Sequence, residues 1–214
     1  MIPQRFSVDY PTRVWALYEK SVSRAKAEGL EVSLLLTVAM PLILIPMERR
    51  RTDGSVSRPS REGAWHEALQ AKFDHTVADS GLVSEPWLAS WRYGRIGPGS
   101  PLNRVDAWLD AEGMHPLRRV DAQGVGQKTF KELMRALRNG MAHGNVVYLS
   151  ERFGEDAQRP VRHLAFVSNA DQGSQSLKQV VCVEVEAFED FLRAWAAWLS
   201  GFTLPSKISL ARRQ

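Results

Sequence analysis

Residues 130–145 read Phe-Lys-Glu-Leu-Met-Arg-Ala-Leu-Arg-Asn-Gly-Met-Ala-His-Gly-Asn and contain the clearest helical pattern in the chain. Apolar residues recur every three or four positions, which predicts an amphipathic helix over about residues 126–142. Its apolar stripe consists of Phe130, Leu133, Met134, Leu137 and Met141. Gly144 is a natural stop, because glycine readily adopts the left-handed conformation that ends many helices. We therefore expect a helix with one buried side and one polar side.

Two side chains near the end of this helix can carry chemistry. Arg138 and His143 are five positions apart, which on a straight α-helix corresponds to about 140° of rotation. Arg138 should therefore flank the apolar stripe, whereas His143 should point away from it. Two arrangements would bring the pair together: Gly140 could loosen the last turn, or a second copy of the chain could supply the complementary residue across a two-fold axis.

A guanidinium and an imidazole can together cleave a phosphodiester without a metal, because one stabilises negative charge while the other moves protons. Asn139 lies one turn before His143, so its amide can hydrogen-bond the imidazole and fix the tautomer. Lys131 and Arg135 add positive charge on the same helix. The simpler alternative is a helix cap, since arginine and histidine near a helix C-terminus are favoured by the helix dipole alone.

The string Leu137-Arg-Asn-Gly-Met-Ala-His-Gly-Asn145 resembles the signature of the HEPN superfamily (higher eukaryotes and prokaryotes nucleotide-binding domains). Its Arg-Asn start and His-Gly-Asn finish are similar to a plasmid-associated bacterial family of about this length. The apolar segment 34–46 and the closing segment 191–198 are also similar to that family. The resemblance implies a helical bundle that dimerises through its motif helices.

The same resemblance implies a metal-independent endoribonuclease that acts as a toxin or in phage defence. Carried over by position, the catalytic residues are Arg138, His143 and Asn139, and the RNA-binding residues are Arg135, Lys131 and Asn145. The implied partners are RNA, a second copy of the chain and an antitoxin or regulatory protein, without a cofactor, a metal or a membrane. Two alternatives stay open: a catalytically inactive module that binds nucleotide or protein, and a structural protein in which the pair only caps a helix.

Three further helices are predicted in the first third of the chain. Asp9 and Pro11 suit the start of the first helix, and Gly29 suits its end. Its apolar face consists of Val14, Leu17, Tyr18 and Val22. The second helix begins near Glu31 and is apolar nearly all round, so it should be central.

Prolines should interrupt that second helix. Pro41 is expected to kink or break it and Pro46 to end it, before a loop at residues 52–60. A third helix then carries Trp65, Leu69 and Phe73 at a spacing of four. Two short helices are expected farther on, at residues 84–88 and 103–111, with a loop at residues 94–101 between them.

After the motif helix the pattern changes to strands at residues 145–149, 162–167 and 179–185, with a hairpin loop at 168–175. The last helix follows Glu186 and buries one face. The apolar residues of that face are Phe188, Phe191, Leu192, Trp195, Leu199 and Phe202. The predicted fold is therefore mainly α, a helical bundle with a small antiparallel sheet or hairpin inserted before the C-terminal helix, in a single domain spanning residues 1–214.

The bulk composition agrees with a globular chain. Its 214 residues are 44% hydrophobic and 24% charged, and the net charge of +4 permits a polyanionic partner. Cys182 is the single cysteine, which excludes an intrachain disulfide and is expected to be a small buried hydrophobe. We expect a cytoplasmic protein, because the N-terminus lacks a signal core and the apolar segment 34–47 is better read as a core helix than as a membrane span.

Other patterns are weaker. Residues 124–129 lack the glycine–lysine order of a phosphate loop and are better explained as a helix start. His66 and His75 have no accompanying ligand pattern for a metal. The basic runs 49–51 and 118–119 are either solvated surface or a track for RNA. Aromatic residues near residue 90 are expected to pack a core rather than stack on bases; these are Trp87, Trp91 and Tyr93.

Overall fold

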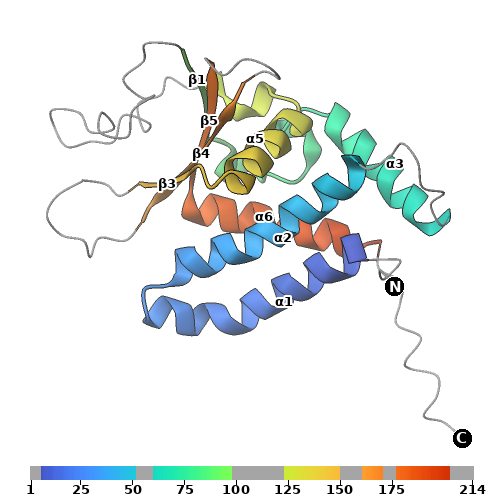
Figure 1. The fold of residues 1–214 in the computed structure, drawn as a ribbon, viewed down its shortest axis with the longest axis horizontal. Coiled ribbons are helices and arrows are strands. Elements are labelled where there is room, and N and C mark those ends of the chain that lie inside the picture. Colours follow the sequence, from blue (N-terminus) through green and yellow to red (C-terminus); the bar gives the residue numbers. More distant parts are fainter. Residues whose placement is uncertain (1–5, 52–59, 98–122, 150–160, 171–176, 203–214) are drawn as a thin grey trace, which may run out of the picture.

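A computed structural model of the protein describes residues 6–51, 60–97, 123–149, 161–170 and 177–202 (Figure 1). The helices of this part are α1 (Phe6–Ala27), α2 (Glu31–Arg51), α3 (Ser60–Asp74), α4 (Glu85–Leu88), α5 (Phe130–Ala142) and α6 (Val185–Ser200), with short 3-10 turns η1 (Ala78–Ser80) and η5 (Val125–Gln127). The strands are β1 (Trp91–Ile96), β2 (Gln123–Gly124), β3 (Val146–Leu149), β4 (His163–Asn169) and β5 (Lys178–Glu184). The fold is mostly helical with an antiparallel sheet before the C-terminal helix, which confirms the predicted fold class.

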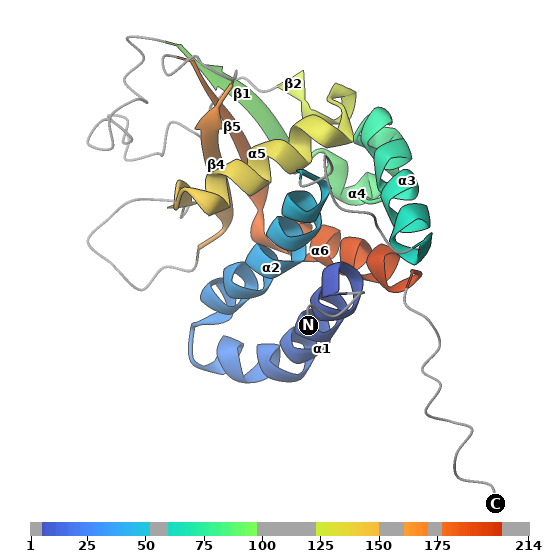
Figure 2. The ribbon, with the colours of Figure 1, turned by 45° about the vertical axis from the view of Figure 1, so that its right-hand side comes forward.

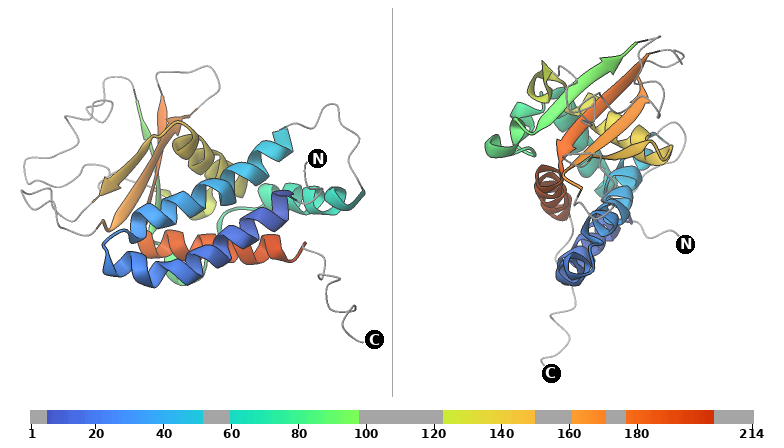
Figure 3. Two further views of the ribbon diagram at one scale, coloured as in Figure 1. Left: turned by 60° about the horizontal axis from the view of Figure 1, so that its bottom comes forward. Right: turned by 90° about the vertical axis from the view of Figure 1, so that its left-hand side faces the viewer.

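The described strands form one sheet in the order β2-β1-β5-β4-β3, with antiparallel pairing throughout. Helix α5 lies against β4 and β5, and α2 lies between α5 and α1 (Figures 1 and 3). The helices α2 and α5 are neighbours that run in opposite directions (Figure 2). The motif helix is thus held between the sheet on one side and α2 on the other.

Strand β1 corrects the beginning of the predicted loop at residues 94–101, of which residues 98–101 lie outside the described residues. Gly94, Arg95 and Ile96 pair with β5, opposite Val180, Gln179 and Lys178. Gly94 is part of a strand because β1 lies inside the sheet between β2 and β5, where backbone pairing outweighs the glycine signal. The predicted helix at 103–111 lies outside the described residues, as do nearly all of the predicted loop at 52–60 and most of that at 168–175.

Helix α2 does not end at Pro46 as predicted but continues to Arg51, and it is also continuous through Pro41. Pro46 has no N–H, so the carbonyl of Leu42 loses its usual helical donor. The indole N–H of Trp195 on α6 donates to that carbonyl oxygen at 2.8 Å, and both residues are fully buried. The tertiary hydrogen bond therefore replaces the backbone bond that the proline removes.

Helix α1 also differs from its prediction. It begins at Phe6, ahead of Pro11, and ends just before Gly29, whose positive φ of 68° matches the expected stop. Tyr18 is buried, as predicted, but Leu17 is 60% exposed and does not belong to the core face.

The core lies where the apolar stripes of α5 and α6 meet. All five predicted stripe residues of α5 are buried, and the Phe130 ring packs against Trp195 with 6.0 Å between ring centroids. Buried residues from other elements confirm further expectations; these are Trp65, Leu69, Phe73, Trp91, Tyr93 and Cys182. The amphipathic pattern of α5 therefore located the core correctly.

The segment Glu31–Glu48 of α2 is long and apolar enough, by length and composition alone, to cross a membrane. In the structure this helix packs against α1, α5 and α6. Val38 and Met47 are both buried although they are nine positions, or about 180° of rotation, apart, which is the packing of a core helix.

Candidate functional site

Helix α5 begins with a complete capping box. The Thr129 hydroxyl accepts a hydrogen bond from the backbone N–H of Glu132 at 3.2 Å, and the Glu132 carboxylate accepts from the backbone N–H of Thr129 at 2.9 Å. This reciprocal arrangement satisfies two backbone donors that a helix start would otherwise leave open. Residues 124–129 therefore form a helix start, as expected, rather than a phosphate loop.

The end of α5 is equally well defined. Gly144 has a φ of 67°, the N–H of Gly144 donates to the carbonyl of Met141, and the N–H of Asn145 donates to the carbonyl of Gly140 at 2.8 Å. These two bonds form a Schellman motif, in which His143 is the C-cap residue. The N–H of His143 still donates to the carbonyl of Asn139 at 3.2 Å, so the chain leaves the helical spiral after His143, at Gly144.

Gly140 does not loosen the helix, which corrects one of the two arrangements considered from the sequence. It is buried within α5, and a Cβ at this position would lie 3.0 Å from the Cβ of Phe166 and 3.3 Å from its Cα. Glycine is thus needed because the backbone of α5 approaches β4 closely. The function of Gly140 is packing rather than flexibility.

Arg138 flanks the buried stripe as predicted, and its guanidinium is held from two sides. Its Nε and Nη2 both donate to Oε1 of Glu48 on α2, and the Nε bond is 2.7 Å long. Its Nη1 donates to Oδ1 of Asn139 at 2.6 Å. The Arg138 side chain is 17% exposed and that of Glu48 is 48% exposed.

The contact with Glu48 was missed by the sequence reasoning. The prediction that Pro46 ends α2 placed Glu48 beyond the helix, where its direction could not be inferred. Because α2 continues, Glu48 lies one turn after Leu44 and two turns after Met40. In this position the Glu48 carboxylate contacts Arg138 at the side of α5.

The predicted hydrogen bond between Asn139 and the imidazole of His143 is not formed in the described part of the chain. The amide oxygen of Asn139 accepts from Arg138 instead. His143 is exposed, and as the C-cap residue it has φ −102° and ψ 6°. Asn139 thus contacts the guanidinium rather than the imidazole.

The other predicted RNA-binding residues are spread along α5: Lys131 lies in its first turn, Arg135 in its middle, and Asn145 just beyond its end. Lys131 is exposed and Arg135 half-buried, and helical geometry places both on the arc between Arg138 and His143. Asn145 is exposed, and its carbonyl accepts from the N–H of Val167 at 2.9 Å. By angle around α5, the acidic Glu132 also lies between the arginine and the histidine of the motif, so Arg135 is the basic residue of this arc that lies near Arg138.

A family model described as HEPN pEK499 p136 matches residues 2–202 of the chain. The chain belongs to this HEPN family. No curated protein and no solved structure matches it. HEPN domains are typically ribonucleases that act on RNA and dimerise, and the family is plasmid-associated, as the resemblance in the sequence implied.

Within the described ranges of this HEPN domain, no group of three or more His, Cys, Asp or Glu side chains is placed to hold a metal ion. His75 is exposed, and the side chain of His66 lies outside what the structure describes. The groups that can do chemistry at the end of α5 are therefore the guanidinium, the imidazole and the neighbouring amide.

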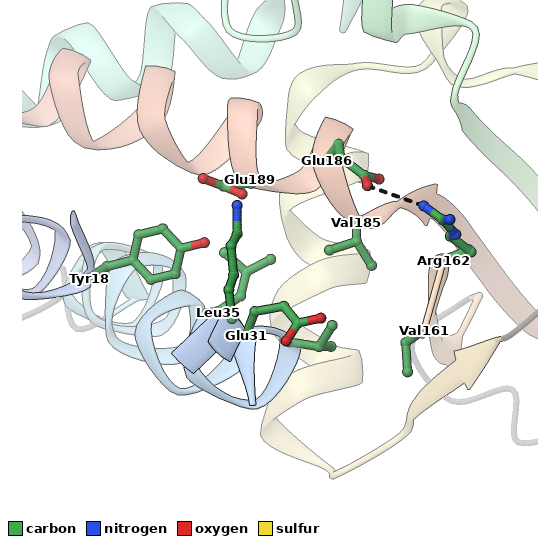
Figure 4. A pocket seen from close by; sticks show the side chains of 10 residues that line it. Tyr18, Glu31, Leu35, Val161, Arg162, Val185, Glu186 and Glu189 are labelled. Atoms are coloured by element: carbon green, nitrogen blue, oxygen red, sulfur yellow. Dashed lines mark ion pairs between the residues drawn. The ribbon is translucent and has the colours of Figure 1, made fainter. Parts of the chain in front are cut away.

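The HEPN domain also has a cavity of about 160 Å³ that is separate from the motif (Figure 4). It lies at the start of α2, about 25 Å along that helix from Glu48. Glu31, Glu186 and Glu189 line it, and Arg162 forms a 3.9 Å ion pair with Glu186. Burial raises the pKa of the Tyr18 phenol, and the charge of Glu189, which also accepts its hydrogen bond, raises it further.

Proposed function

We propose that this HEPN domain is a metal-independent endoribonuclease that works as a homodimer, as a toxin or phage-defence effector in the cytoplasm. The observation that supports this most is the position of Arg138, Asn139 and His143 together at the C-terminal end of α5, with Arg135 one turn before Arg138. Family membership supports RNA as the substrate. Arg138, His143 and Asn139 are the proposed catalytic residues, and Lys131, Arg135 and Asn145 the proposed RNA contacts.

The proposed reaction begins when a ribose 2′-hydroxyl attacks the adjacent phosphorus and the bond to the 5′-oxygen of the next nucleotide breaks. His143 takes the proton of the attacking hydroxyl or gives one to the leaving oxygen, since imidazole can do both near neutral pH. Arg138 stabilises the negative charge on the phosphoryl oxygens. The products are a 2′,3′-cyclic phosphate and a 5′-hydroxyl, so DNA should not react.

A second copy of the chain is part of this proposal. On a regular helix the Arg138 and His143 directions differ by about 140°, and α5 continues as an α-helix through Gly140, which packs against β4. On α2, the helix beside the site, Met40 is 43% exposed, and Leu36 and Leu44, four positions on either side of it, are partly buried against the core. An exposed apolar side chain on the helix beside α5 suits the surface on which two motif helices meet.

The test is cleavage of single-stranded RNA by the purified protein in EDTA. We expect cyclic-phosphate products, no cleavage of DNA of the same sequence, and a loss of about 100-fold or more in Arg138→Ala and in His143→Ala. An equally active His143→Ala protein would refute the mechanism. Retained RNA binding without any turnover by the wild type would instead indicate the inactive HEPN module.

Mixing the two inactive variants tests the shared site. If Arg138 of one subunit acts with His143 of the other, a mixed dimer of Arg138→Ala and His143→Ala contains one complete site, so about a quarter of the wild-type activity should return on mixing. If both residues act within one subunit, mixing restores nothing. A protein that cleaves RNA as a monomer would refute the dimeric part of the proposal.

A further inference from the structure

Glu48 on α2 and Arg138 on α5 are 90 positions apart in the chain, and their contact joins the two helices. Arg138 is the more buried partner, with 17% of its side chain exposed, whereas Glu48 is 48% exposed. An exposed ion pair of this kind contributes little to stability. Its main physical effect is to restrict the rotation of a long side chain that would otherwise have many conformations.

The hydrogen bonds of the guanidinium show which part of it is left for a substrate. Of the five N–H groups of arginine, the one on Nε and one each on Nη1 and Nη2 are engaged by Glu48 and Asn139. One N–H on Nη1 and one on Nη2 have no acceptor among the described residues. Because Nε and Nη2 donate to the same carboxylate oxygen, the second N–H of Nη2 is directed toward the Nη1 end of the plane.

We propose that Glu48 is a positioning residue that orients Arg138 for a phosphate, an inference that rests on the proposed ribonuclease function. Glu48 holds the Nε edge of the guanidinium and Asn139 holds Nη1, so the second N–H of Nη2 and the N–H of Nη1 that Asn139 does not engage are available to a phosphoryl group of the RNA. Two donors are the number that a bidentate contact with phosphate requires.

If Glu48 orients Arg138, its role depends on the side-chain oxygen that accepts the hydrogen bonds and less on the negative charge of the carboxylate. A glutamine at the same position keeps a side-chain oxygen of the same reach, so it can accept the same bonds from Nε and Nη2. An alanine cannot. The opposite possibility is that the carboxylate competes with phosphate for Arg138, in which case either substitution should increase turnover.

The experiment compares Glu48→Gln and Glu48→Ala with the wild type in EDTA, using a pool of fluorophore-labelled single-stranded oligoribonucleotides. We expect Glu48→Ala to lower kcat by about 10-fold to 100-fold with little change in KM, because a misoriented group loses transition-state rather than ground-state contacts. Glu48→Gln should stay close to the wild type. Glu28→Ala is the matched control, since Glu28 also pairs with an arginine, Arg24, at an exposed helical position far from the motif.

Three outcomes would overturn the assignment: higher turnover in Glu48→Ala, unchanged turnover in Glu48→Ala, or an equal loss in both Glu48 variants. Thermal melting of each variant shows whether a loss reflects unfolding. A second readout separates this inference from the proposed function. In ¹⁵N spectra the Nε–H signal of Arg138 should be protected from exchange in the wild type and Glu48→Gln, and lost in Glu48→Ala.

RNA cleavage and the Nε–H signal of Arg138 can each give a negative result without the other. A wild-type protein that cleaves no RNA refutes the proposed function, while the Nε–H signal still reports whether Glu48 orients Arg138. A wild-type protein that cleaves RNA but shows no protected Nε–H refutes the positioning role alone.

Discussion

Helix α5 carries its apolar residues in one stripe and ends at a left-handed glycine, whereas α2 is apolar on most of its sides and passes through two prolines. The two helices are neighbours, and together they hold Arg138. Local sequence explains nearly all of α5, including its cap, its stripe and its end. Helix α2 depends on a partner, because the carbonyl freed by Pro46 is satisfied by Trp195 from α6.

This difference between α5 and α2 shows which residues of a site can be placed from the sequence alone and which cannot. Residues on α5 can be placed by counting along the helix, because helical periodicity alone assigns each of them to one side. A residue on α2 beyond Pro46 can be placed only once the contact with α6 is known. The candidate site combines both kinds of residue.

The largest effect is expected where α5 meets the sheet. Replacing Gly140 by leucine puts a side chain where even a Cβ would lie 3.0 Å from Phe166. Overpacking against a backbone should lower the free energy of unfolding by about 3 kcal/mol. Urea denaturation measures this.

The control for that substitution is Ala142→Leu, which adds the same side chain at an exposed position of the same helix. It should change the free energy of unfolding by less than about 0.5 kcal/mol. If Gly140→Leu were equally harmless, the close approach of α5 to β4 would be wrong, and a loosened last turn would again be possible.

The second prediction concerns the proline in α2. Trp195→Phe removes the N–H that donates to the Leu42 carbonyl, which leaves a buried acceptor unsatisfied. We expect a loss of about 2 kcal/mol in the free energy of unfolding. The same substitution made together with Pro46→Ala should cost less, because alanine restores a backbone N–H to that carbonyl.

A double-mutant cycle on Trp195 and Pro46 isolates this coupling, which should be about 1 kcal/mol or more. Additive losses from the two substitutions would mean that the indole stabilises α2 only by packing. In that case another interaction would have to explain why α2 continues to Glu48.

These two helices also show how much was predictable from sequence. The spacing of Arg138 and His143, the stripe from Phe130 to Met141 and the stop at Gly144 follow from helical periodicity and glycine conformation alone, and the structure confirms the helix they define. The catalytic and RNA-binding assignments of these residues stay predictions.

What could not be predicted depends on contacts between distant segments. Pro46 is an end signal in isolation, and only the Trp195 indole, 153 positions from Leu42, cancels it. Glu48 was missed for the same reason. Gly140 looked flexible because its close neighbour Phe166 belongs to a strand whose register the sequence does not reveal. Asn139 was assigned to His143 by its spacing, but the guanidinium beside it is the stronger donor.

The smallest effect is expected at the other end of α2, where Tyr18 of α1 lies beside Glu31 and Glu189. Burial favours the neutral phenol and raises its pKa in the folded protein. The resulting contribution to stability is complete below about pH 10, the ordinary pKa of tyrosine. It is lost as the pH rises toward the higher pKa of the folded state, because the unfolded chain releases the proton first.

Tyr18→Phe should therefore lose less stability than the wild type when the pH is raised from 8 to 10.5, by a difference below about 1 kcal/mol. Tyr148→Phe is the control for removing the hydroxyl of an exposed tyrosine, since Tyr148 is 46% exposed. Urea denaturation of the three proteins at both pH values measures the slopes. Equal slopes for Tyr18→Phe and the wild type would mean that the phenol ionises as readily in the fold as in the unfolded chain. The start of α2 would then not be closed over by α1 and α6, and the dependence of α2 on its neighbours would be confined to the proline that Trp195 compensates.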